Sequence, residues 1–376
     1  MSNKISRIVL TGGPCGGKTT GLAYIRQKLE EKGFIVFIVP EAATLCINAG
    51  ISPFNPSLTP FTIQNAIIRT AKHLEDTWIA SAQTVKNEKG IVLIYDRGIN
   101  DCRSYTEEHV YKQVLNDLNL HLVEARDARY DAVIHLKSVA CDKPGSYTLA
   151  NNTARREDIQ QASERDEQIM NSWVGHPHLR VLDNSTDFEG KIKRVHQEVC
   201  SVLGIPVPIE REQKFLISFD RNDLPSHAQH IDIEQVYLAI SDKEEIRVRK
   251  RGQNGYFTYY QTTKRPGLTP DERYEVDRII NSDQYHFGLS LKQSDTDIIF
   301  KERTCFLHKD QYMEIDKFND KNVLPPRTGL LELESTNKNS SIQIPPWIKV
   351  IKEVTGEKEY SNAYLSQRLA LNKSSA

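Results

Sequence analysis

The sequence lacks the features that mark several large classes of protein. Its six cysteines are scattered and form no CxxC pair, which argues against a disulfide framework or a zinc site and predicts reduced thiols. No apolar run approaches the ~20 residues of a membrane span. The first residues show no signal-peptide pattern, so we expect no transmembrane segment and a cytoplasmic location. The net charge of -1 excludes a general basic field that would attract nucleic acid or anionic lipid.

The length of the chain, 376 residues, predicts two domains, because a single hydrophobic core rarely serves so many residues. Residues 5–204 alternate strand and helix signals, which predicts a parallel sheet with crossover helices. The strand candidates are short apolar runs without polar alternation, as expected of strands covered on both faces. They are residues 5–11, 34–40, 91–96, 131–136 and 179–182.

The character of the sequence changes after Gly204, which we expect to end a helix. Residues 205–209, IPVPI, predict a short stiff linker between domain 1–204 and domain 210–370, and we expect a flexible tail at 371–376. Runs with alternating character then dominate, separated by turn signals such as GQNG and RPG. The predicted fold is therefore an α/β parallel-sheet domain followed by an antiparallel β-barrel domain of the α+β class.

The strongest motif is GGPCGGKT at residues 12–19, which satisfies G-x-x-x-x-G-K-[ST] directly after a predicted strand and at the start of a predicted helix. Glycines let the backbone curl so that several N–H groups point at a phosphate, and the helix N-terminus adds partial positive charge. Lys18 would bridge the β- and γ-phosphates of ATP or GTP, and the Thr19 hydroxyl would ligate Mg²⁺ or Mn²⁺. The predicted nucleotide-binding residues of this loop are Gly13, Cys15, Gly16, Gly17, Lys18, Thr19 and Thr20.

Other residues support this loop with less specific signals. Asp96 ends an apolar strand, where a carboxylate for the metal or for catalysis is expected, and Arg97 follows it at the ligand-binding edge of the sheet. Glu41 is a candidate for orienting an acceptor or a metal-bound water, with a surface glutamate as the alternative. Arg155 and Arg156 could fold over the phosphates as a lid, or begin a solvated helix.

Residues 5–204 resemble the P-loop kinase-like ATPases related to nicotinamide riboside and nucleoside kinases. The segments that carry the resemblance are GGPCGGKTT, PEAAT, DRG, ARRE and WVGHPHLRVLDN. It implies a nucleoside-kinase-like sheet and binding of nucleotide and Mg²⁺. Phosphoryl transfer is an activity that it allows but does not require. It does not identify an acceptor or separate ATP from GTP.

The predicted second domain places like charges on one face of several strands. Period-two spacing puts Glu210, Glu212 and Lys214 on one face. The same spacing recurs in Arg247 with Arg249, Lys301 with Arg303, and Glu332 with Glu334. Such pairs are poor for a packed core, and they favour a wet cavity in which cations grip a polyphosphate and carboxylates hold metal ions. For any one pair a solvated strand face is the alternative.

This set resembles the CYTH, or triphosphate tunnel metalloenzyme, family, with EREQK, IRVR, TTK, RYE, KER, EIDKF and LLELE in the family's order. The resemblance implies metal-side carboxylates at Glu210, Glu212, Glu332 and Glu334, with Asp316 also a metal candidate. It implies triphosphate-binding cations at Lys214, Arg247, Arg249, Lys264, Lys301 and Arg303. Glu275 and Asp316 would brace those cations or orient water, which makes Glu275 a catalytic candidate.

The pairing of the two domain types resembles the TRPL translocation defect type proteins, which implies guanine-nucleotide binding and recognition of a phospholipid headgroup. Two functions therefore compete. One is an enzyme that transfers or hydrolyses phosphoryl groups of a nucleoside triphosphate or an inorganic or organic triphosphate. The other is a nucleotide-dependent binder of a phospholipid headgroup. A nucleic-acid enzyme is weaker, because the cations and aromatics of RVRKRGQNGYFTYY are better explained as strands, so no stable nucleic-acid partner is expected.

Overall fold

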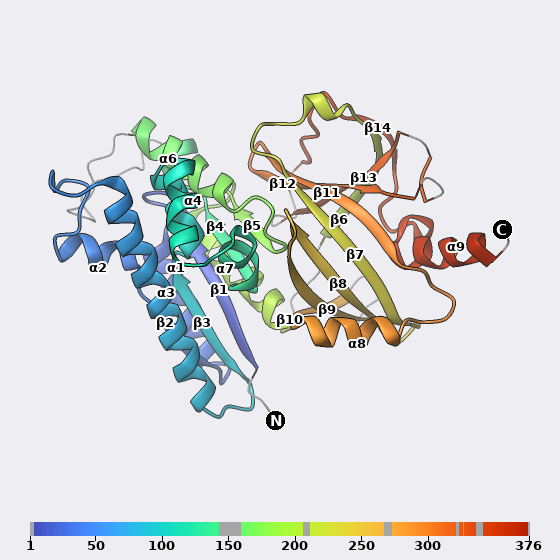
Figure 1. The fold of residues 1–376 in the computed structure, drawn as a ribbon, viewed down its shortest axis with the longest axis horizontal. Coiled ribbons are helices and arrows are strands. Elements are labelled where there is room, and N and C mark those ends of the chain that lie inside the picture. Colours follow the sequence, from blue (N-terminus) through green and yellow to red (C-terminus); the bar gives the residue numbers. More distant parts are fainter. Residues whose placement is uncertain are drawn as a thin grey trace. The chain divides into compact units, whose positions relative to one another are not determined.

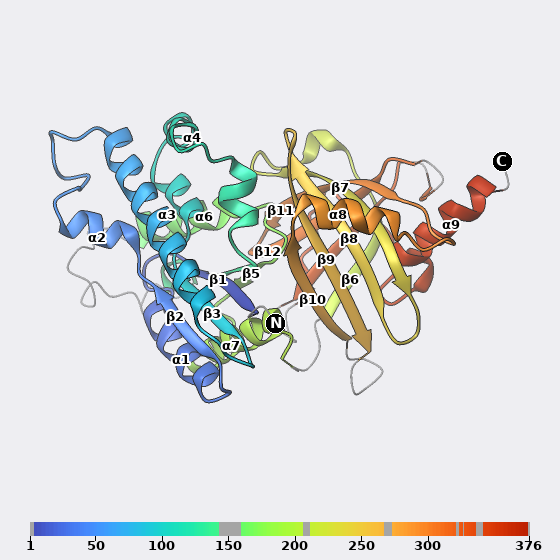
Figure 2. The same ribbon diagram turned by 60° about the horizontal axis from the view of Figure 1, so that its bottom comes forward.

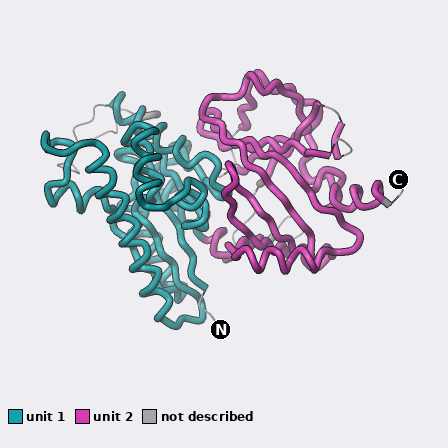
Figure 3. The backbone as a smooth tube through the Cα atoms, viewed as in Figure 1, with its two compact units in different colours: residues 1–199 teal, residues 200–376 magenta. Residues whose placement is uncertain are grey.

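The computed structural model describes residues 4–142, 159–205, 211–266, 273–320, 323–325, 327–335 and 341–374. The chain divides into two compact units, residues 1–199 and 200–376 (Figure 3). Each unit has its own sheet, one parallel and one antiparallel, which confirms the predicted fold class. The domain limits at 204 and 210 stay predictions.

The first unit is an α/β sheet whose five strands run in the order β2-β3-β1-β4-β5, all parallel (Figure 1). Helices α1 and α7 lie on one face of this sheet, and α3 and α4 lie on the other (Figure 2). The strands are β1 (Ile5–Thr11), β2 (Ile35–Val39), β3 (Ile91–Asp96), β4 (Ala132–Leu136) and β5 (Leu179–Leu182). The helices are α1 (Lys18–Glu30), α2 (Ala42–Asn48), α3 (Pro60–Thr84), η1 (Ile99–Tyr105), α4 (Glu108–Asp117), η2 (Glu124–Ala128), α5 (Val139–Asp142), α6 (Ile159–Ser172) and α7 (Phe188–Leu203).

The topology of this sheet fixes where a ligand site can form. Strand β1 lies between β3 and β4, and Leu10 near its end pairs with Asp96 at the end of β3. Because all strands are parallel, the loops that follow β1, β2, β3 and β4 meet at one edge. The P-loop after β1 therefore has the residues after β3 as direct neighbours.

The second unit is built on a nine-stranded antiparallel sheet in the order β10-β9-β8-β7-β11-β12-β13-β6-β14 (Figure 1). The strands are β6 (Arg211–Ser218), β7 (Gln229–Ile240), β8 (Glu245–Gln253), β9 (Tyr256–Pro266), β10 (Arg273–Ile280), β11 (Ile299–His308), β12 (Gln311–Phe318), β13 (Gly329–Ser335) and β14 (Lys349–Glu353). The helical segments are η4 (Arg221–Asp223), α8 (Ser282–Ser290), η5 (Lys358–Tyr360) and α9 (Asn362–Ser374). The predicted GQNG turn joins β8 to β9, with positive φ at Asn254 (55°) and Gly255 (82°).

The two faces of this sheet differ in chemistry. Its outer face is apolar: Val236 and Val248 pack against Tyr285 of α8, and a second cluster on β6, β11, β12 and β13 packs against Trp347. The opposite face, which we call the inner face, carries the charged residues at alternate positions. Period-two alternation therefore separates a packed layer from a charged one, as predicted.

Two strands and two α-helices of the second unit were not predicted from the sequence: β7, β14, α8 and α9. Strand β7 is regular as far as Tyr237, where a register shift before Ala239 breaks its alternation. Helix α8 has a recognisable start, since Asn281 and Gln284 form a capping box. The predicted helix end at Gly204 is confirmed, because α7 ends at Leu203 and Gly204 has a φ of 68°.

Two expectations about absent features can be compared with the described part of the chain. None of the helices in it is long and apolar enough to cross a membrane. Of the cysteines, Cys15, Cys46, Cys102, Cys200 and Cys305 form no disulfide, in agreement with the prediction of reduced thiols.

Candidate functional site

The P-loop lies between β1 and α1, as the motif requires. Gly12 and Gly17 have φ values of 141° and 94°, in a region that favours glycine. A Cβ on Gly12 or Gly16 would lie 2.1 or 2.5 Å from the carbonyl oxygen of Leu136 on β4, so the loop can pass this strand only as glycine. The half-buried Cys15 also has a positive φ of 59°. The backbone thus has the curled conformation that phosphate cradles use.

Lys18 begins α1 and folds back over the loop. Its Nζ donates hydrogen bonds to the carbonyl oxygens of Gly12 (2.7 Å) and Gly13 (3.0 Å). Burial and the charge of Arg97 lower its pKa to about 7, although Glu41 and Asp96 oppose the shift. The positive charge of the amine is therefore poorly compensated at this place, and the negative charge of a phosphate would stabilise it. Thr19 and Thr20 follow as exposed residues of the first turn of α1.

The residues after β2 and β3 complete this edge of the sheet. Arg97, with a φ of 70°, places its Nε 2.7 Å from Oε1 of Glu41, the residue before α2. Burial alone would raise the pKa of Glu41, but Arg97, Thr44 and Lys18 hold it below its ordinary value. Burial and the charge of Glu41 raise the pKa of Asp96, so the two carboxylates crowd one another beside Lys18.

Asp101 was not predicted, yet it links three parts of this site. Its Oδ1 accepts hydrogen bonds from Oγ1 of Thr11 (2.6 Å) and Nε1 of Trp173 (3.0 Å), and its Oδ2 accepts from the N–H of Gly98 (2.8 Å). The carboxylate is 2% exposed. It fixes the end of β1 to the turn that carries Arg97. The two partners outside its own turn lie 90 and 72 residues away in the chain, so local patterns could not reveal this role.

Asp166 on α6 holds the P-loop from the other side. Its Oδ1 accepts a hydrogen bond from the N–H of Gly13 (2.6 Å) and lies 3.1 Å from Nε2 of His135 on β4. Burial would raise the pKa of Asp166, but His135 and the N–H of Gly13 lower it to about 2. Asp166 therefore stabilises the folded loop in its ionised form. The lid candidates Arg155 and Arg156 lie outside the described residues, as does Glu210.

Asp166→Asn is expected to lower the free energy of unfolding of the first unit by about 2 kcal/mol at pH 7. A carboxylate with a lowered pKa in the folded state contributes stability above its unfolded value, near pH 4, and loses it as the pH falls towards about 2. Urea unfolding of the two proteins at a series of pH values should therefore show a gap that closes below pH ~4. The exposed Glu164→Gln on the same helix is the control. A gap that does not change with pH would contradict this role.

The inner face of the second unit carries two ionic clusters. The first, the β11–β6 cluster, is centred on Asp316, which accepts hydrogen bonds from Lys301 and from Nε (2.7 Å) and Nη2 (2.7 Å) of Arg303. Oε2 of Glu332 lies 2.7 Å from Nη2 of Arg303, and its Oε1 lies 2.9 Å from Nζ of Lys214. Asp316 and Lys301 are 0% and 3% exposed. Both carboxylates thus hold cations in place, which is the bracing role predicted as one option for Asp316.

The second cluster, the β8–β10 cluster, joins Arg247, Arg249 and Lys264 to carboxylates on β10. Glu275 lies 2.8 Å from Nζ of Lys264 and 3.3 Å from Nη2 of Arg247, and Arg249 pairs with Asp277. Burial would raise the pKa of Glu275, but Lys264 and Arg247 lower it. Glu275 is therefore a poor proton acceptor here, and of its two predicted roles the contacts favour bracing.

Curvature of the sheet brings the two clusters towards each other. Glu212 on β6 is among the charges that raise the pKa of Lys264 on β9, although five strands lie between β6 and β9 in the sheet order. Likewise, Lys214 on β6 acts on the pKa of Tyr237 on β7. Charges interact in this way only across short distances, so the inner face is concave, and we call its charged part the hollow.

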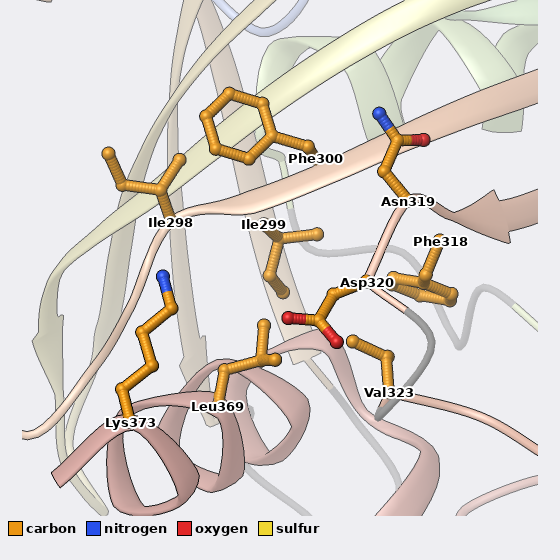
Figure 4. Close-up of a pocket in the computed structure, with 9 residues that line it drawn as sticks. All are labelled: Ile298, Ile299, Phe300, Phe318, Asn319, Asp320, Val323, Leu369 and Lys373. Atoms are coloured by element: carbon orange, nitrogen blue, oxygen red, sulfur yellow. The ribbon is translucent and has the colours of Figure 1, made fainter. Parts of the chain in front are cut away.

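An apolar layer lies at one end of the inner face, where Leu216, Tyr237, Leu330 and α9 meet. A small cavity beside it has a volume of about 60 Å³ and contacts Phe318, Val323 and Leu369 (Figure 4). Such a volume suits about two water molecules. It is too small for a triphosphate, so the charged part of the inner face is the candidate site.

The predicted metal ligands of the second unit are only partly brought together. Glu332 and Glu334 on β13 lie opposite Lys214 and Glu212 on β6, and Glu212 and Glu334 are exposed. Within the described ranges, no group of three or more His, Cys, Asp or Glu side chains is placed to hold a metal ion. These residues alone do not make a metal centre, and a metal site in this unit stays a prediction.

Three inner-face residues with partners were missed, although period-two spacing could have found them. Asp277, which pairs with Arg249, lies two residues after Glu275. Glu314, which pairs with Arg303, lies two residues before Asp316. Arg251, two residues after Arg249, is 3% exposed. Residues two positions apart share one face of a strand, so the spacing that identified one residue of each strand also identifies the next residue on that face.

Comparisons with known proteins assign the first unit. Residues 7–191 match the family model of the AAA domain, so the N-terminal part of the chain is an AAA-type P-loop domain. No curated protein matches the chain. Among solved structures, the hypothetical protein NE1496 is 25% identical over 42% of this chain and 98% of its own, with a TM-score of 0.31. The inorganic triphosphatase NE1496 is 25% identical over 43% of this chain and 96% of its own, also with a TM-score of 0.31.

Proposed function

We propose that the first unit binds a nucleoside triphosphate and transfers or hydrolyses its γ-phosphate. The observation that carries this proposal is the glycine loop with Lys18 folded over it, beside Asp96 and Arg97 at the carboxyl edge of a parallel sheet. A hydroxyl at Thr19 and a carboxylate at Asp96 are hard oxygen donors of the kind Mg²⁺ and Mn²⁺ prefer. The crowding of Asp96 by Glu41 gives a further reason for a cation to bind there.

The chain's own groups would act on the phosphates by position and charge. Backbone N–H groups of the loop would hold the β-phosphate, and Lys18 would leave the carbonyl oxygens of Gly12 and Gly13 for the β- and γ-phosphates. The ion neutralises charge on the phosphates when bound. Arg97, fixed by Glu41, would stabilise negative charge that develops on the transferred group. Whether the nucleotide is ATP or GTP stays open.

We propose in addition that the hollow of the second unit binds a triphosphate group. Lys214, Arg247, Arg249, Lys264, Lys301 and Arg303 all lie on the inner face, and the carboxylates that brace them pre-organise their positions. Hydrolysis there would in addition need a metal ion. A phospholipid headgroup has no observation in its favour beyond the same cations, and it stays an alternative prediction.

The test is phosphate release from ATP, GTP, thiamine triphosphate and inorganic triphosphate, each with Mg²⁺ or Mn²⁺. The full chain is compared with Lys18→Ala in the first unit and Arg249→Gln in the second. We expect turnover of at least one nucleoside triphosphate that is lost in Lys18→Ala and kept in Arg249→Gln. Turnover of inorganic triphosphate that is lost only in Arg249→Gln would make the second unit a triphosphatase. If no substrate turns over and none binds, both proposals are wrong.

A further inference from the structure

Two arginines of the first unit converge on one aromatic ring next to the P-loop. Tyr105, at the end of η1, has the guanidinium carbon of Arg97 at 5.8 Å from its ring centre and that of Arg165 at 4.6 Å. Arg97 follows β3, while Arg165 belongs to α6, more than sixty residues later in the chain. Fold topology therefore assembles this Arg97–Tyr105–Arg165 group from three separate elements.

Both arginines have donors without a partner among the described residues. Nη1 of Arg97 and Nε of Arg165 are buried and find no hydrogen-bond partner in the part of the chain that the structure describes. Buried guanidinium donors are costly to leave unpaired, and they bind phosphate and carboxylate groups strongly. The positive φ of Arg97 (70°) is a further sign of a position held for function at some conformational cost. An anion is the ligand that this chemistry suits.

The place of the group in the site says what kind of anion it is. Arg97 is close enough to Lys18 to be the main charge that lowers the pKa of that amine, so the group lies beside the place where Lys18 would hold the γ-phosphate. Glu41, predicted to orient an acceptor or a metal-bound water, is ion-paired with Arg97 at 2.7 Å and is therefore poorly suited to take a proton from a hydroxyl acceptor. An acceptor that is already ionised needs no such base.

We infer that Arg97 and Arg165 form the acceptor subsite of the first unit, and that the acceptor is a phosphate monoester. This inference rests on the proposed phosphoryl transfer. An ionised oxygen of the acceptor phosphate forms a bond to the γ-phosphorus while the bond to the β–γ bridging oxygen breaks. The nucleoside diphosphate leaves with the electron pair of that bond, and the acceptor becomes a diphosphate. No proton has to be removed.

The test measures binding by calorimetry to the full chain saturated with Mg²⁺ and a non-hydrolysable nucleoside triphosphate. The probes are the four common ribonucleoside 5′-monophosphates and glucose 6-phosphate, with the parent nucleosides and glucose as neutral controls. We expect at least one monoester to bind and its neutral parent not to bind. Arg165→Gln should weaken that binding about tenfold to a hundredfold, the effect of one charged hydrogen-bonding group, and leave the affinity for the nucleoside triphosphate unchanged.

Further variants separate this role from a structural one. Arg97→Lys keeps the charge beside Glu41 but loses the planar set of guanidinium N–H donors, so it too should weaken binding of the monoester. Arg69→Gln removes an arginine elsewhere on the unit, so it should have no effect. The inference is overturned if no monoester binds while the nucleoside triphosphate does, or if Arg165→Gln binds the monoester like the wild type. Failure of the wild type to bind the nucleoside triphosphate would instead overturn the proposed function.

Discussion

Lys18→Ala is expected to weaken binding of a nucleoside triphosphate by about a hundredfold or more, because charged hydrogen bonds to two phosphates are lost. The same change should leave the stability of the nucleotide-free protein within about 1 kcal/mol, since burial already disfavours the charged amine there. Without nucleotide, the hydrogen bonds that Lys18 makes within the described part of the chain go to carbonyl oxygens of the loop, and its pKa is lowered to about 7. A large loss of affinity without a matching loss of stability identifies a ligand-binding lysine.

Calorimetry with ATP and GTP measures the affinity, and urea unfolding measures the stability. Lys28→Ala in the same helix is the matched control, because its Nζ pairs with Glu31 at the surface and it should change neither quantity by much. Lys18→Arg should not restore binding, since the larger planar group does not fit a loop shaped around an ammonium. An affinity of Lys18→Ala within about threefold of the wild type, a change of less than 1 kcal/mol, would contradict the assignment.

The parts of the site that the sequence predicted are those encoded by neighbouring residues. The P-loop is contiguous from Gly12 to Thr19, and Asp96 and Arg97 directly follow an apolar strand, so pattern and position were enough. Asp101 and Asp166 could not be found in this way. Each acts through hydrogen bonds to residues that are distant in the chain, Thr11 for Asp101 and Gly13 for Asp166.

The second unit shows the same division between spacing and pairing. Period-two alternation predicted which residues share the inner face, because side-chain direction is a local property of a strand. Which carboxylate meets which cation depends on the register between strands. Arg303 lies directly opposite Asp316 in the pairing of β11 with β12, and Glu332 lies opposite Lys214 in the pairing of β13 with β6. No single-strand pattern contains that information.

The register of β11 with β12 leads to the largest stability effect expected in the second unit. Asp316→Ala should lower its free energy of unfolding by about 3–5 kcal/mol, the usual cost of leaving a buried charge unpaired. Asp316 is fully buried and accepts hydrogen bonds from both Lys301 and Arg303. Without it the two cations face each other, and the pKa of Lys301, which burial has already lowered to about 8, should fall further.

Urea unfolding followed by a signal from the second unit measures this effect, and two variants make the result specific. Glu212→Ala, at a side chain that is 44% exposed, should cost less than about 1 kcal/mol. The double variant Asp316→Leu/Lys301→Met replaces a buried ion pair with apolar groups and should recover much of the loss of the single variant. If Asp316 instead served chiefly as a metal ligand, its removal would relieve repulsion with Glu332, and the metal-free protein would become more stable. The sign of the change in unfolding free energy therefore decides between a brace for the inner-face cations and a metal ligand.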